Sequence, residues 1–166
     1  MSSMPIRQLR FLPLRSLPFW AAAALLAACA PDAPKGVDKD QLDAAVSQAI
    51  GDPYSCLFIA EQGSGRVVYR FNTHLACDRK LPACDAPQVR TLDELLKATL
   101  KDGRPRQLSC SSSPDNSRGV SWASGVLPSK GLTYAAMMEG DRAFPGRMIA
   151  ERLDGAFAKV GLAPKR

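Results

Sequence analysis

The first 28 residues constrain this chain most, because their pattern is that of a segment removed before the rest of the protein folds. Arg7, Arg10 and Arg15 form a basic leader without an acidic residue, and the apolar run 17–28 (LPFWAAAALLAA) follows it. A basic leader, a short apolar core and small residues at its end are typical of a secretory signal. The run is too short to span a bilayer, which takes about 20 apolar residues. The sequence therefore predicts export and assigns residues 1–28 to a signal peptide.

The apolar run ends in Leu26-Ala27-Ala28-Cys29. This tetrapeptide resembles the lipobox of bacterial lipoproteins, in which the signal is cut before the cysteine and the thiol carries a diacylglycerol. The resemblance implies that Cys29 anchors the mature chain to a membrane of the cell envelope, facing the periplasm, and no other cofactor is expected. Ala30 follows in place of an aspartate, which by analogy with enteric sorting favours the outer membrane over the inner one. The alternative is an ordinary secretory signal cut near Ala28 or Ala30, with Cys29 left as a spare thiol.

Removal of this segment changes the charge balance of the protein. The whole chain carries 22 Lys and Arg against 16 Asp and Glu, a formal net charge of +6. The leader takes three arginines and no acidic residue with it, so the mature chain carries 19 − 16 = +3. Nucleic-acid-binding domains cluster their Lys and Arg on one face, and a small charge spread along an exported chain does not predict such a partner. The expected partners are the membrane, through the anchor, and an envelope protein.

Four cysteines remain once Cys29 is assigned to lipid: Cys56, Cys77, Cys84 and Cys110. An even number in an oxidising compartment predicts disulfides, and four cysteines allow three pairings. Cys77 and Cys84 bracket a short loop, so a local bridge is favoured, and it forces Cys56 to pair with Cys110. A zinc site of His74, Cys77, Cys84 and Cys110 is the less favoured alternative, because the spacing is irregular and exported cysteines are more often oxidised than metallated.

The remaining chain divides into a tether, residues 29–37, and one domain, residues 38–166. The tether is rich in Ala and Pro and has no hydrophobic periodicity. Helices are expected after Asp38, after Thr91 and from Pro145, the second of them opened by a Thr91–Glu94 capping box. Strands are expected at 54–61, 66–71, 106–112, 119–127 and 132–139, and residues 72–90 form a long irregular segment. Five larger side chains at strand and helix spacing are predicted to be core residues: Trp122, Tyr134, Met137, Met138 and Phe157.

The element order α-ββ-α-βββ-α favours an α+β fold, an antiparallel five-stranded sheet flanked by helices. This order resembles that of roadblock-like domains and of the sheet half of serine β-lactamases and penicillin-binding transpeptidases. Both families place the first strand beside the last and the third strand at the far edge. Cys56 and Cys110 would then be at least two strand spacings apart, roughly 10 Å, whereas a disulfide needs Cα atoms within about 7 Å. Either the sheet order or this pairing must be wrong.

The serine enzymes of that family carry Ser-x-x-Lys on the helix after the first hairpin and Lys-Thr-Gly on the third strand. The chain contains neither motif, and Ser129-Lys130-Gly131 falls in a turn. The stretch 119–123 (GVSWA) comes within one residue of the Gly-x-Ser-x-Gly nucleophile elbow, but the elbow needs a helix after the serine. Here a strand continues, and the only histidine, His74, precedes Ser121, so a solvent-facing strand serine is favoured.

These observations favour a lipid-anchored cell-envelope protein with a non-enzymatic binding or structural role and an unknown ligand. The alternative is an envelope serine hydrolase distantly related to penicillin-interacting enzymes, using Ser121 or another serine.

Overall fold

The computed structural model describes residues 33–164. The signal-like segment and Cys29 lie outside these residues, so export and lipidation remain predictions. Among the described residues, no helix combines the length and the apolar character needed to cross a membrane.

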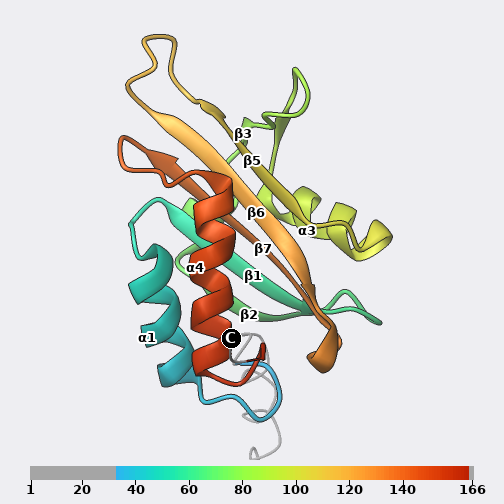
Figure 1. Cartoon of the computed structure of the whole chain (residues 1–166). Coiled ribbons are helices and arrows are strands. Elements are labelled where there is room, and N and C mark those ends of the chain that lie inside the picture. Colours follow the sequence, from blue (N-terminus) through green and yellow to red (C-terminus); the bar gives the residue numbers. More distant parts are fainter. Residues whose placement is uncertain (1–32, 165–166) are drawn as a thin grey trace, which may run out of the picture. The chain divides into compact units, whose positions relative to one another are not determined.

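The fold is α+β, as the sequence predicts, with a five-stranded sheet in the order β2-β1-β7-β6-β5 and antiparallel pairing throughout (Figure 1). The elements are α1 (Lys39–Ile50), β1 (Ser55–Glu61), β2 (Val67–Phe71), α2 (His74–Cys77), β3 (Leu81–Pro82), β4 (Val89–Arg90), α3 (Leu92–Asp102), β5 (Arg106–Ser111), β6 (Gly119–Leu127), the 3-10 turn η1 (Pro128–Lys130), β7 (Leu132–Gly140) and α4 (Gly146–Lys159). The first strand lies beside the last, and β5 forms the far edge.

The helices begin where local side-chain chemistry predicts. Asp38 accepts a hydrogen bond from the amide of Gln41 at 2.9 Å, which satisfies one of the unpaired donors of the first turn of α1. Thr91 and Glu94 form the full capping box of α3, with each side chain bonded to the other's backbone amide. Gly103 then ends α3 at a φ of 67°, in the left-handed region that glycine enters without steric cost.

Each face of the sheet is covered by a different apolar layer. Helices α1 and α4 lie side by side on one face and α3 covers the other (Figure 1). The α1–α4 layer buries Leu42, Val46, Leu57, Ile59 and Phe157, whereas the α3 layer buries Phe58, Leu92, Leu95, Trp122 and Met137. Strand β1 is buried on both faces, which explains its nearly continuous apolar sequence.

The segment 72–90 is more ordered than the sequence predicts. It contains the single-turn helix α2 and the short antiparallel ladder of β3 with β4. The indole Nε1 of Trp122 donates to the carbonyl of Pro82 at 2.8 Å, which holds the ladder against the α3 face of the sheet. The expectation of an irregular loop is wrong here, because two-residue strands leave no periodic signal in the sequence.

Two disulfides tie this segment to the sheet: Cys56–Cys77 and Cys84–Cys110, with Cα–Cα distances of 5.3 and 5.4 Å. The pairing favoured from the sequence, Cys77 with Cys84 and Cys56 with Cys110, is therefore wrong. The sheet order expected from the family resemblances is the one found, and it places β7 and β6 between Cys56 on β1 and Cys110 on β5. The segment crosses the sheet, so Cys77 bonds to β1 and Cys84 bonds to the far-edge strand β5.

The packed chain begins before Asp38. Pro34 is buried, its carbonyl accepts a hydrogen bond from the amide of Val37 at 3.0 Å, and Val37 packs against the α1–α4 core. Only residues 30–33 separate Cys29 from Pro34, and an extended chain of this length reaches at most about 18 Å. Pro34 and Val37 are thus part of the packed domain.

Gly146, at the start of α4, sits where the helix meets the backbone of β5 and β6. A Cβ atom there would lie 2.5 Å from the Trp122 carbonyl oxygen and 2.6 Å from that of Leu108. Backbone atoms inside a sheet cannot move aside, so Gly146→Ala should destabilise the fold by about 3 kcal/mol in denaturant titrations.

Gly155 on the same helix provides the matched control for Gly146. It has no neighbour within 4 Å of an added Cβ, and Gly155→Ala should instead stabilise by roughly 0.5 to 1 kcal/mol because alanine favours the helix. Equal effects of the two substitutions would contradict the close packing described for Gly146.

Candidate functional site

The zinc site considered from the sequence does not form. The three cysteines it would need are consumed in the two disulfides. His74 is largely exposed, and its Nδ1 lies 2.5 Å from Arg70 Nη1 and 3.7 Å from Asp78. Within residues 33–164, no group of three His, Cys, Asp or Glu side chains is placed to hold a metal ion.

Ser121 lies on a strand, as expected, but it is buried and does not face solvent. Ser121 is buried, and its hydroxyl donates a hydrogen bond to the Ser109 hydroxyl at 3.1 Å. The Ser109 oxygen also accepts a hydrogen bond from the backbone amide of Gly146 at 2.8 Å. This chain of bonds joins β6, β5 and the start of α4. The Ser121 hydroxyl is therefore used in a structural hydrogen bond. His74, the only histidine that could activate it, lies beside Arg70 and Asp78 instead.

The five larger side chains predicted to be core residues are buried, which confirms that assignment. Tyr134 and Phe157 meet edge to face with ring centroids 5.2 Å apart, an arrangement favoured by aromatic quadrupoles. These residues belong to the apolar layers on the two faces of the sheet.

The most unusual polar feature of the described chain is Glu139, near the end of β7. Its side chain is only 4% exposed, and a carboxylate is rarely buried to this extent without cationic partners. It shares the α3 side of the sheet with Met137 two residues earlier, so it closes the end of the layer that holds both disulfides.

Glu139 accepts four hydrogen bonds. Arg118 donates through Nε and Nη2 at 2.9 and 2.8 Å, Arg79 through Nη1 at 2.9 Å, and Ser112 through its hydroxyl at 2.9 Å. Four bonds match the acceptor capacity of a carboxylate. The hydrogen bonds from Arg118 come first among the causes that lower the pKa of Glu139 from its ordinary value of 4.5 to about 2, against the opposing effect of burial.

Both arginines also face the ring of Tyr54. Their guanidinium carbons lie 5.6 Å (Arg79) and 5.7 Å (Arg118) from the ring centroid, within cation–π range. Tyr54 is half exposed. We refer to Tyr54, Arg79, Ser112, Arg118 and Glu139 as the arginine cluster.

The sheet register explains why residues so far apart in sequence meet. Ser55 of β1 pairs with Met138 of β7, Gly140 of β7 pairs with Gly119 of β6, and Ser111 of β5 pairs with Gly119 from the other side. The residues next to these pairs therefore gather at one end of the sheet. Arg79 reaches the same end because Cys77, two residues earlier, is bonded to Cys56 at the start of β1.

The sequence analysis missed this cluster. One signal was present: Glu139 ends a strand, LTYAAMME, whose other residues suit a fully buried position. A buried carboxylate in such a strand requires a cationic partner. No pattern in the neighbouring sequence indicates that Arg118 and Arg79, 21 and 60 residues away, are these partners.

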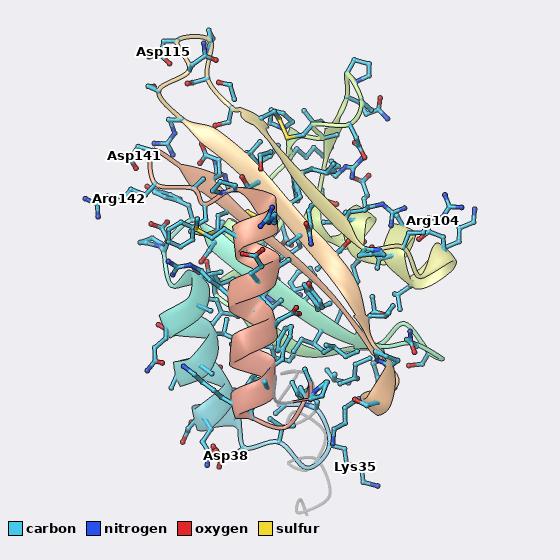
Figure 2. The ribbon with its side chains drawn as sticks, in the orientation of Figure 1. Lys35, Asp38, Arg104, Asp115, Asp141 and Arg142 are labelled. Atoms are coloured by element: carbon cyan, nitrogen blue, oxygen red, sulfur yellow. A yellow bond between two sulfur atoms is a disulfide. The ribbon has the colours of Figure 1, made fainter. Side chains whose placement is uncertain are left out.

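A hollow of about 740 Å³ lies at the other end of the domain, between the β6–β7 turn and the end of α4. Its lining includes the apolar side chains of Leu127, Pro128, Leu162 and Ala163, with Glu151 and Asp154 among its acidic residues. Figure 2 shows Lys35 and Asp38 at this end of the domain, and Asp115, Asp141 and Arg142 toward the opposite end. The arginine cluster, which adjoins Asp141 in sequence, is thus remote from the point where the chain enters the domain.

Comparisons with known protein families, with curated proteins and with solved structures found no match.

Proposed function

We propose that this protein is a lipid-anchored cell-envelope binding protein, held in the outer membrane by a diacylglycerol on Cys29 and facing the periplasm. Its α+β domain has a binding role and no catalytic one. It presents the arginine cluster, at the end of the sheet remote from the chain entry, to a partner in the envelope.

The pair of disulfides is the observation that carries this proposal. Both bonds lie in the α3 layer and fasten one connecting segment to β1 and to β5. Structural disulfides persist in oxidising compartments and are rare where thiols are kept reduced. They support export, which the basic leader and apolar run predict independently, and the Leu-Ala-Ala-Cys end of that run supports lipidation rather than simple secretion.

The anchor is tested by growing bacteria that produce the protein with radiolabelled palmitate. Label is expected in the wild-type protein and absent from Cys29→Ala. A count of free thiols in the denatured protein adds a second readout: the lipidated chain should show none, whereas a chain cut before an unmodified Cys29 should show one. Label that persists in Cys29→Ala, or no label in the wild type, would overturn the anchoring proposal.

The alternative of a serine hydrolase gains no support from the geometry at Ser121, because its hydroxyl is buried against Ser109. A fluorophosphonate probe tests it directly. No serine of the purified protein is expected to react, and stoichiometric labelling of one serine would replace the binding proposal with a catalytic one.

A further inference from the structure

We propose that the arginine cluster is a binding site for a phosphate group. This inference deepens the proposed binding role by naming the ligand chemistry, and it does not depend on the lipid anchor. It rests on the donors left over at Arg79 and Arg118, on their fixed geometry and on their access to solvent.

The two guanidinium ions carry more donors than Glu139 can use. Each has five N–H groups, and three of these ten bond to the carboxylate. In the described part of the chain, no other hydrogen bond involves either guanidinium group. Seven N–H donors therefore remain for another acceptor.

The buried carboxylate also leaves an uncompensated positive charge. Glu139 neutralises one of the two arginines, which leaves +1 on these three residues. Asp141 and Arg142 follow Glu139 in the chain and are both exposed. The hydrogen bonds to Glu139 are the main cause that raises the pKa of Arg118, and Asp141 adds a smaller electrostatic contribution. Arg142 adds a cation, so the five charged groups sum to +1.

Glu139 fixes where the two guanidinium groups lie. Arg118 Nη2 and Arg79 Nη1 bond to the same carboxylate oxygen, Oε2, at 2.8 and 2.9 Å. These nitrogens can be no farther apart than 2.8 + 2.9 = 5.7 Å, so one tetrahedral oxyanion can contact both groups. The arginines are thereby ordered before a ligand arrives, which lowers the entropic cost of binding it.

Both side chains are accessible. Arg79 is 33% exposed and Arg118 41% exposed, in contrast to the 4% of the carboxylate between them. Tyr54, half exposed and facing both guanidinium groups, forms one wall of the site. Planar forks of N–H donors suit phosphate oxygens, which accept charge-assisted bonds from arginine.

The test is calorimetric titration of the full-length protein, in a nonionic detergent at low salt, with inorganic phosphate. A dissociation constant of about 1 mM or lower is expected for a few charge-assisted contacts. A parallel titration with short-chain phosphatidic acid distinguishes a lipid headgroup from a free phosphate as the source. Binding of either probe supports the site, and binding of neither overturns it.

Arg79→Gln is the decisive variant, because Arg118 keeps its two bonds to Glu139 and the fold should persist. It should weaken binding of the probe about tenfold. Arg147→Gln serves as control. Arg147 is 79% exposed and pairs with Glu151 on α4, which covers the face of the sheet opposite to the one that carries Glu139. This variant therefore removes the same charge from the other face of the sheet. Equal loss in both variants would show only a general charge effect and would overturn the proposal.

The result of the phosphate titration is independent of the result of the palmitate-labelling test. Phosphate binding by Cys29→Ala should equal that of the wild type. Loss of palmitate labelling would leave the phosphate site intact, and failure of phosphate binding would leave the anchor intact.

Discussion

Removal of both disulfides is expected to destabilise the domain by about 6 kcal/mol, an amount comparable to the whole stability of many domains, about 5 to 15 kcal/mol. The two bonds close separate loops, with sequence separations of 21 and 26 residues. The loss of chain entropy in the unfolded state corresponds to about 3 kcal/mol for each loop of this length. The measurement is denaturant unfolding of Cys56→Ala/Cys77→Ala, of Cys84→Ala/Cys110→Ala and of the fourfold variant.

Burial predicts the order in which the two bonds are reduced. Cys56 and Cys77 are almost fully buried, whereas Cys84 and Cys110 are only partly so. Mild reductant should therefore open Cys84–Cys110 first, which alkylation and mass spectrometry would reveal. Cys29→Ala is the control and should leave the unfolding midpoint unchanged. A fourfold variant within about 1 kcal/mol of the wild type would contradict the structural role assigned to the disulfides.

Glu139→Ala is expected to cost about 3 kcal/mol, because it removes a buried carboxylate together with the charge-assisted hydrogen bonds that Arg118 and Arg79 donate to it. Glu139→Gln retains the shape of the side chain but loses its charge, and it should cost less. Glu151→Gln offers a matched control, because Glu151 pairs with Arg147 on the surface of α4 with 56% of its side chain exposed. Exposed pairs contribute at most about 1 kcal/mol, and similar losses in the two Gln variants would contradict the buried role of Glu139.

The same carboxylate predicts how stability depends on pH. The pKa of Glu139 is lowered to about 2 in the folded protein, so the unfolded chain binds its proton more tightly. The resulting stabilisation is complete above about pH 5 and is lost as the pH falls toward 2, in total about 3 kcal/mol. Asp102 and Asp115 also have pKa values lowered to about 2, so the wild type loses their contribution over the same range.

The contribution of Glu139 is therefore the difference between wild type and Glu139→Gln, measured by denaturant unfolding from pH 7 to pH 2. The two curves should converge as the pH falls. Curves that stay parallel over this range would contradict the pKa assigned to Glu139.

Features set by neighbouring residues could be predicted from the sequence. The Thr91–Glu94 capping box depends on a four-residue pattern, and the apolar run of β1 indicates a central strand by itself. The order of the strands required a resemblance to known folds, because five strands can be arranged in many ways and periodicity does not select among them.

Features set by the path of the chain across the sheet could not be predicted. The segment 72–90 contains two of the four cysteines, so their partners depend on where that segment crosses the strands. Ser121 and Glu139 illustrate the same difficulty: alternation along a strand assigns a face but does not show how deeply a helix or a loop covers it. The arginine cluster combines residues from five positions between 54 and 139, which only the register of the sheet brings together.

The burial of Pro34, only five residues after Cys29, limits how far the domain can stand from the membrane. If Cys29 is acylated as proposed, its link to Pro34 extends at most about 18 Å. A link this short keeps the domain, and the arginine cluster with it, near the lipid surface. Partners embedded in the same leaflet would meet it at high effective concentration, whereas a partner held farther away would have to extend toward the membrane itself.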